Sequence, residues 1–239
     1  MKKARIRKIK DFEKFYDNCK AIFTKLRDDD KRVEIFEKEY MLSICPGSRA
    51  GGNEKRIVEI FWGARPYEFI TTGNAWQSLI EKGATLLFYR NDTGDVTIYL
   101  HPAKTEYIQP IEDSIALHKW LDPQKLNNEQ FIKSLWNDFI AYMECTSLDG
   151  KPTYSQKLRV NYLRFFKHLV IDKHWMPTKF SKFSLDILKW ILTVGLSGGI
   201  LLAISYLTQP KITETDIQLK KVNKKLEIIS KQIENNSTH

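Results

Sequence analysis

The sequence has few cysteines, and the way they are distributed excludes a disulfide framework. Among its 239 residues only 3 are cysteines, and they lie far apart at Cys19, Cys45 and Cys145. No two of them have the spacing of a metal or redox motif. An odd number of distant cysteines indicates reduced thiols that are buried as small hydrophobic side chains in a cytosolic domain.

Catalytic motifs are also missing. His101, His118, His168 and His174 have no metal-ligand spacing to cysteine or acidic residues. No serine lies in a nucleophile-elbow pattern. The acidic pair at 112–113 could serve acid–base chemistry, but at an expected helix start it more simply favours the helix dipole. We therefore predict no enzymatic activity, no catalytic residue, no metal site and no cofactor.

Charge is absent from one long stretch near the end of the sequence. No residue from Trp190 to Pro210 is charged, although 28% of the chain is charged. A bilayer core is crossed by a helix of about 20 mostly apolar residues, which predicts a transmembrane helix over 187–209. A buried core helix is the alternative, although a run of roughly 10–14 residues would suit it better.

The residues before this stretch predict a folded cytosolic domain over 1–183. The mean hydropathy of the chain is −0.40, and its 12% aromatic content argues against disorder. The basic N-terminal residues are not followed by an apolar stretch, so no export signal is expected. Basic residues flank both ends of the apolar run and do not decide the orientation. We expect a single-pass protein of the cell inner membrane, with the large N-terminal domain in the cytoplasm.

The pattern of this domain predicts both helices and strands. Amphipathic spacing over 8–27 indicates a helix, and residues 84–90 and 95–101 flank a turn at 91–94 that is typical of a hairpin. The remaining expected elements are an antiparallel strand pair at 33–44 and 56–62, and helices at 67–82, 111–121, 131–143 and 158–171. The predicted fold class is an α+β domain with a small mixed sheet of at least four strands and packed helices. A transmembrane helix and a C-terminal amphipathic or coiled-coil helix would follow it.

The glycine-rich loop between the first two expected strands is the best ligand-binding candidate. Backbone amides of such loops can hold anions, and basic side chains add charge. The candidate residues are Arg49, Gly51, Gly52, Lys55 and Arg56. The loop lacks the G-K-[ST] ending of a phosphate loop, so a flexible surface loop is the alternative. With a net charge of +9, the expected ligand is anionic, such as a nucleotide or oligonucleotide.

A second mixture of aromatic and basic residues lies at 162–167. Such side chains can stack on the bases of single-stranded nucleic acid. Their helical spacing favours the core face of a helix instead.

The predicted transmembrane helix carries small residues in one sector and hydroxyl residues in another. Gly195, Gly199 and Ala203 recur every four residues, a spacing that lets helices pack closely in lipid. The hydroxyl residues fall in another sector and could line a pore, or could bond to their own backbone; they are Thr193, Ser197, Ser205 and Thr208.

The tail at 211–235 has the a/d pattern of a short coiled coil. Its seam residues are Leu219, Val222, Leu226, Ile229 and Ile233. An amphipathic helix lying on another surface is the alternative. A packing stripe followed by a coiled coil predicts a homo-oligomer.

The order of the domains resembles that of the membrane effectors of bacterial anti-phage signalling systems. The resemblance lies in a soluble part up to about Phe183, one span and a short tail, and it carries over no functional residue. It implies a domain that senses a ligand or partner and triggers a membrane event. The most specific form of that event is ion channel or pore formation. The alternatives are a membrane-anchored module that recruits a protein partner without conductance, and a membrane-tethered enzyme.

Overall fold

The computed structural model describes residues 2–52, 55–72, 75–186 and 224. Residues 1–183 form one compact unit, and residues 184–239 belong to a second.

The helices of the first unit begin and end where the local sequence provides the signals. In α1, Phe12, Phe15, Cys19 and Phe23 recur at three- and four-residue spacing and are all buried, which gives the helix one apolar face. Thr153 and its partner Gln156 form a capping box at the start of α4. The helices are α1 (Lys2–Asp28), α2 (Val33–Tyr40), the 3-10 helix η1 (Pro123–Asn127), α3 (Glu129–Thr146) and α4 (Tyr154–Phe166).

The central element is a sheet of seven strands in the order β1-β2-β5-β6-β7-β8-β9. All of its strand pairs are antiparallel. Its strands are β1 (Leu42–Pro46), β2 (Ile57–Trp62), β5 (Thr85–Arg90), β6 (Val96–His101), β7 (Ser114–Leu121), β8 (His168–Ile171) and β9 (His174–Trp175).

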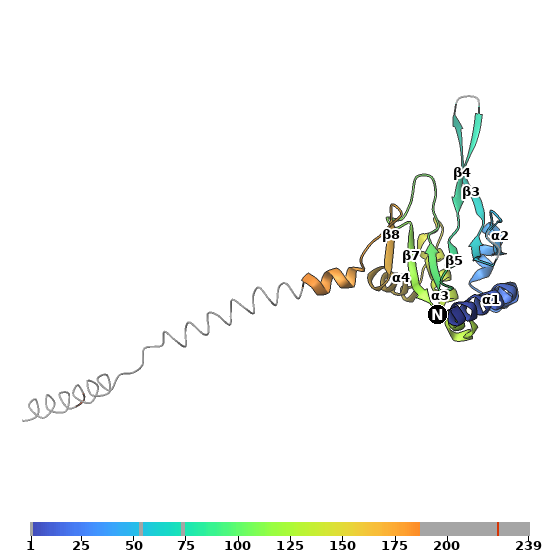
Figure 1. The fold of residues 1–239 in the computed structure, drawn as a ribbon. Coiled ribbons are helices and arrows are strands. Elements are labelled where there is room, and N and C mark those ends of the chain that lie inside the picture. The colour runs from blue at the N-terminus through green and yellow to red at the C-terminus, as the bar shows by residue number, and fades with distance from the viewer. Residues whose placement is uncertain (1, 53–54, 73–74, 187–223, 225–239) are drawn as a thin grey trace, which may run out of the picture. The chain divides into compact units, whose positions relative to one another are not determined.

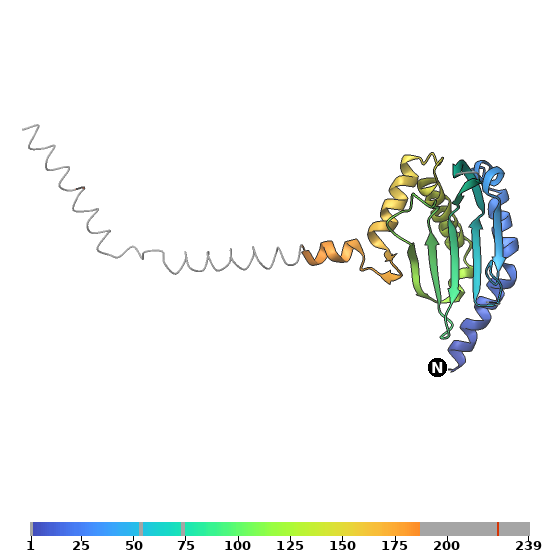
Figure 2. The ribbon, with the colours of Figure 1, turned by 90° about the horizontal axis from the view of Figure 1, so that it is seen from above.

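The helices α1, α3 and α4 cover one side of this sheet, and no described helix within residues 2–183 covers the other side. Figure 1 shows α1, α3 and α4 together on one side of the strands. The core lies between these two layers: the Phe15 and Phe88 rings are 5.0 Å apart, and Phe23 lies 6.2 Å from Trp136. In Figure 2 the strands are seen from the opposite side, with no helix of the described region in front of them.

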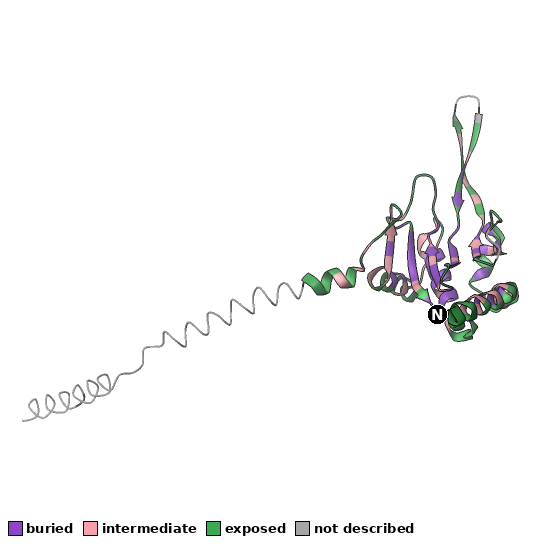
Figure 3. Ribbon diagram, viewed as in Figure 1, coloured by how far each residue is buried: buried purple, intermediate pink, exposed green. Residues whose placement is uncertain are grey.

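The strands β3 (Ala64–Thr72) and β4 (Ala75–Lys82) form a separate two-stranded hairpin, which we call the arm. The arm connects β2 to β5 and rises away from the helices (Figure 1). Much of it is exposed (Figure 3), including Phe69 at 64% and Trp76 at 79%. Since an isolated two-stranded hairpin is marginal in water, its base must be held by the rest of the domain.

Several sequence predictions are confirmed. The helix expected at 8–27 is α1, the strand at 56–62 is β2, and the helix at 131–143 is α3. The hairpin predicted around 91–94 is formed by β5 and β6.

Other predicted elements are wrong. The strand expected at 33–44 is mostly α2, and the helix expected at 67–82 is the arm. The helix expected at 111–121 is β7, and the one at 158–171 ends at Phe166 and continues as β8. The predicted mixed sheet is instead antiparallel: all its neighbouring strands run in opposite directions, including β7 and β8, which η1, α3 and α4 connect.

The membrane-spanning part of the predicted fold class is contradicted. Among the described residues, no helix is both long and apolar enough to cross a bilayer. The longest of these helices, α1, has 27 residues but carries many lysines and arginines, and it packs one face on the sheet. The transmembrane, single-pass and ion-channel assignments and the inner-membrane localisation are therefore withdrawn.

Many residues on which those assignments depended lie outside the described part of the chain. These are the predicted span at 187–209, its packing residues Gly195, Gly199 and Ala203, and its hydroxyl residues Thr193, Ser197, Ser205 and Thr208. The seam residues Leu219, Val222, Leu226, Ile229 and Ile233 lie there too.

Candidate functional site: the open sheet face

The alternation of side chains along the strands defines a second surface of the sheet. In β2, Val58, Ile60 and Trp62 are buried against the helices, whereas the alternating residues are only half-buried. Successive side chains of a strand point to opposite faces, so Glu59 and Phe61 lie on the side without helices. We call this surface the open sheet face.

Strand register carries one row of residues across this face. Glu59 pairs with Leu87, and Leu87 pairs with Tyr99. Tyr99 pairs with Ala116, which in turn pairs with His168. Residues that are directly opposite in neighbouring strands lie on the same side of a sheet. The open sheet face therefore runs continuously from β2 to β8.

A second row lies beside the first. Phe61 pairs with Thr85, and Thr85 pairs with His101. Burial lowers the pKa of His101, whose Nδ1 lies 3.3 Å from the Asp113 carbonyl oxygen. The imidazole is therefore neutral near pH 7 and presents an uncharged ring. Burial also raises the pKa of Tyr99, which keeps its hydroxyl protonated.

An aromatic cluster is built around Trp175 at one end of this face. The Trp175 ring lies 5.7 Å from Tyr99 and 6.2 Å from His168, and the Lys119 ammonium is 3.6 Å from its centroid. Tyr99 in turn lies 6.2 Å from His101. We call these five residues the Trp175 cluster. The indole is 41% exposed, so part of its surface is free to contact a ligand.

The tight turn between β8 and β9 places Trp175. Asp172 and Lys173 both have positive φ, at 50° and 63°. Two consecutive residues of this kind form the type I′ turn that matches the twist of paired strands. The Lys173 amide also donates to Asp113 Oδ2 at 3.1 Å. The hairpin therefore folds Trp175 back beside Val170, its partner in the register.

Arg49 occupies the other end of the open sheet face. Its guanidinium lies 3.8 Å from the centroid of Phe61 and donates to Thr85 Oγ1 at 2.9 Å. Its backbone amide donates to Glu59 Oε2 at 2.7 Å, and its Nε forms an ion pair with the same oxygen at 3.4 Å. The side chain remains about half exposed, at 46%. This end of the face thus presents a cation on an aromatic ring, as the Trp175 cluster does.

The structure separates the ligand-binding residues that the sequence predicts. Only Arg49 lies on the open sheet face. Gly51 and Gly52 are exposed in the loop with positive φ, and the Lys55 carbonyl accepts a hydrogen bond from Arg90. Arg56 pairs with Asp92, 2.9 Å away beyond the far end of β5. The loop therefore does not bring its three basic side chains to one anion.

Sequence reasoning missed Trp175, Tyr99 and Lys119 as site residues. Alternation in β6 could have placed Tyr99 opposite the core. Trp175 and Lys119 were hidden because β9 has two residues and because the pairing of β6 with β7 is interrupted by register shifts.

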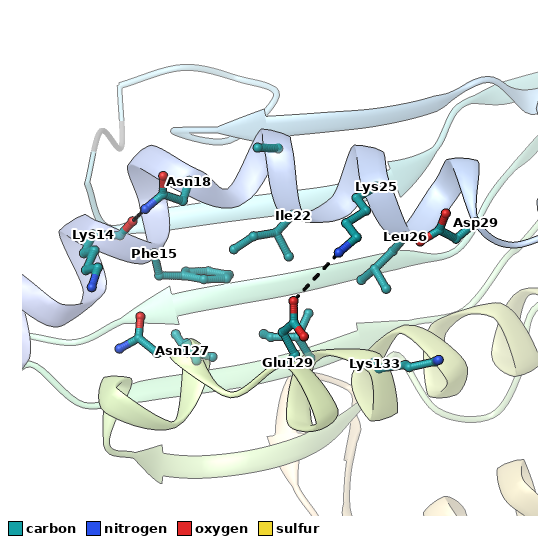
Figure 4. A pocket seen from close by; sticks show the side chains of 13 residues that line it. Lys14, Phe15, Asn18, Ile22, Lys25, Leu26, Asp29, Asn127, Glu129 and Lys133 are labelled. Atoms are coloured by element: carbon teal, nitrogen blue, oxygen red, sulfur yellow. Dashed lines mark hydrogen bonds and ion pairs between the residues drawn. The ribbon is translucent and has the colours of Figure 1, made fainter.

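A groove on the helical side is a weaker candidate. It lies between α1 and the η1–α3 segment and has a volume of about 500 Å³. Figure 4 shows Ile22, Leu26 and Phe15 along it and the Lys25–Glu129 ion pair, 3.9 Å long, across it. Both members of the pair are largely exposed. Because positive and negative side chains both lie at its edge, the groove does not favour one class of ligand.

No group of three or more His, Cys, Asp or Glu side chains that could hold a metal ion occurs in the described ranges. The chain matches no protein family model, no curated protein and no solved structure. The resemblance to anti-phage membrane effectors therefore stays a prediction that no relative tests.

Proposed function

We propose that the open sheet face binds single-stranded nucleic acid. The observation that carries the proposal is that two aromatic rings, each with a cation against it, lie on one helix-free sheet surface: Phe61 with Arg49, and Trp175 with Lys119. Stacking on aromatic rings and contacts from basic side chains to phosphates are the two means by which proteins hold single strands.

The dimensions of the face favour several nucleotides over one. Two strand spacings separate Phe61 on β2 from Tyr99 on β6, which corresponds to about 10 Å at about 4.8 Å per spacing, and the Trp175 ring packs 5.7 Å from Tyr99. One base covers only a fraction of that length. Tyr99 lies between the two ends and offers a further ring. The net charge of +9 favours a polyanion over a neutral ligand.

This proposal retains the expected anionic ligand, a nucleotide or oligonucleotide, and the ligand-sensing part of the predicted function. It moves the binding surface from the glycine-rich loop to the sheet. Arg49 is the residue that the two assignments share.

Fluorescence anisotropy with labelled single-stranded DNA and RNA decamers tests the proposal. Loss of one stacking ring costs about 1–3 kcal/mol, so Trp175→Ala should weaken binding by about 5- to 150-fold. Tyr154→Ala is the control, because Tyr154 is an exposed aromatic residue on α4, on the helical side of the sheet. An equal effect of both substitutions would contradict the assignment to this face. A mononucleotide that binds as tightly as the decamer would contradict the choice of an oligonucleotide.

A further inference from the structure

A hollow of about 280 Å³ lies between β7, α3 and α4. Its wall includes His118 from β7, Asp138 from α3 and Lys167 at the end of α4. His118 pairs in the register with the buried Ile98, and its ring lies 5.1 Å from Phe131 of α3. The hollow is therefore on the helical side of the sheet, opposite the Trp175 cluster.

One cation in the hollow is already neutralised. Arg159 Nε donates to Asp138 Oδ1 at 2.5 Å, and Nη2 donates to the Ser134 carbonyl oxygen and hydroxyl at 3.0 and 3.1 Å. This ion pair joins α3 to α4 and occupies the one carboxylate among the described residues that line the hollow.

The side chains of His118 and Lys167 lack such partners in the described part of the chain, unlike that of Arg159. Neither forms a hydrogen bond or an ion pair within the described residues. Burial lowers the pKa of Lys167, although Asp138 opposes this effect. Burial, followed by the charges of Lys167 and of Lys125 in η1, lowers the pKa of His118 to about 4. His118 and Lys167 thus share one part-buried hollow whose carboxylate among the described lining residues, Asp138, already accepts from Arg159.

We propose that this hollow binds one phosphoryl group, either as inorganic phosphate or at the end of a small molecule. Such an anion would supply the missing acceptor for Lys167 and would favour the charged form of His118. The Ser134 and Tyr162 side chains also line the hollow and can add hydroxyl contacts. The volume is slightly below the roughly 300–1,000 Å³ of sites for larger organic ligands, which favours a small ligand.

Burying a cation without a partner costs free energy, and the cost falls when an anion pairs with it. Opposite charge nearby favours the protonated imidazole. Binding of phosphate must therefore raise the proton affinity of His118, and by linkage the phosphate monoanion must bind more tightly as the pH falls toward the His118 pKa of the complex. A phosphate that merely screens surface charge would leave this histidine unchanged.

An NMR titration of the histidine ring protons in the full chain tests the proposal. The His118 signal is identified by its loss in His118→Gln. Inorganic phosphate, compared with chloride at equal ionic strength, should raise the His118 pKa by at least about one unit, a tenfold change in proton affinity. Phenyl phosphate forms the second arm, because its ring can contact Phe131.

A rise with inorganic phosphate supports a site for the free ion, and a rise with phenyl phosphate alone supports a site for a carried phosphoryl group. An unchanged His118 pKa with both ligands would overturn the proposal, and this result needs no variant. Lys167→Gln should abolish the rise, whereas Lys157→Gln, an exposed lysine of α4 outside the hollow, should retain it. A rise that persists in Lys167→Gln would also overturn the proposal. The test measures the His118 pKa and not oligonucleotide binding, so its outcome is independent of the proposed function.

Discussion

Glu81 is a carboxylate with no exposed surface at the base of the arm. It accepts hydrogen bonds from the Tyr40 hydroxyl at 2.7 Å, from the Leu148 amide at 2.8 Å and from Arg65 Nη2 at 3.0 Å. Arg65 also contacts Glu39 and Asp149. Burial and the bond to Glu81 raise the pKa of Tyr40, which keeps its hydroxyl a donor. This network fixes the arm to α2 and to the end of α3.

Arg65→Met should therefore destabilise the domain by about 3–5 kcal/mol, because it leaves a buried carboxylate without its counter-charge. Arg56→Met removes an arginine from an exposed pair with Asp92 and should cost no more than about 1 kcal/mol. Urea unfolding followed by circular dichroism measures both. Equally small losses would mean that Tyr40 and Leu148 suffice to hold Glu81.

His118 makes the stability of the domain depend on pH. The folded state keeps its imidazole neutral down to a pH of about 4, whereas the ordinary pKa is 6.5. Between these values the unfolded chain binds more protons than the folded one, so stability falls as the pH falls. We expect wild type to lose up to about 3 kcal/mol more than His118→Gln between pH 7 and pH 4 in chloride buffer. Denaturant midpoints at several pH values measure the difference; parallel curves for the two proteins would refute it.

Residue identity alone predicted part of the site. Arg49 could be selected from the sequence because it is a basic residue in a glycine-rich loop. The contact between Arg49 and Phe61 could not be predicted, because that contact depends on how the loop folds back over β2. Lys119 and Trp175 are 56 positions apart by their numbers and meet only because β8 joins β7 in the sheet. Such long-range pairing leaves no local pattern.

At the scale of elements, sequence reasoning failed where two periodicities compete. The segment 33–40 is rich in residues favoured in strands, but Val33, Phe36 and Tyr40 have helical spacing and are the buried residues of α2. In β7, four consecutive residues from Ser114 are buried, and the pairing with β6 shifts twice. Both features hide the alternation by which a strand is recognised. The β5–β6 hairpin was found because its turn and both strands are local.

Gly83 directly follows the segment 67–82 that was expected to be a helix, and it lies in the connection from the arm to β5. A Cβ atom added there would lie 2.3 Å from the Trp62 Cβ and 3.0 Å from the Trp62 carbonyl oxygen. Because Trp62 is buried against Phe139, the neighbour cannot move aside easily.

Gly83→Ala should therefore cost about 3 kcal/mol, at the upper end of typical overpacking costs. Gly51→Ala is the control: it has a φ of +73° but no atom within 4 Å of the added Cβ, so only backbone strain of about 1 kcal/mol is expected. Urea unfolding compares the two variants. A larger loss for Gly51→Ala would show that backbone conformation outweighs crowding.

At the scale of the whole molecule, a net charge of +9 predicts that nucleic acid binding weakens with salt. Each phosphate contact to a single strand contributes a slope of about −0.7 to the logarithm of the affinity against the logarithm of salt concentration. Contacts from Arg49 and Lys119 predict a slope of about −1.4.

Anisotropy titrations at four or more salt concentrations measure that slope. Lys119→Gln should make it shallower by about 0.7, and the exposed Lys157 of α4 provides the matched control. An unchanged slope in Lys119→Gln would remove this lysine from the phosphate contacts.

The arrangement of the whole domain was less predictable than its local parts. An α+β domain with a sheet follows from the sequence pattern, and α1, β2, α3 and the β5–β6 hairpin were located. The strand order was not predictable, because α3 and α4 separate β7 from its neighbour β8. That order determines which side chains share the helix-free face.

The two borders of the sheet have a consequence for how the protein behaves in concentrated solution. One outer strand, β1, has five residues and ends at Pro46, which has no amide hydrogen to donate; the other, β9, has two residues. Sheets of separate molecules fuse by hydrogen bonding along long, regular outer strands. Neither border offers such a template, so the seven-stranded sheet can present a broad surface to a ligand without extending edge to edge into a second copy.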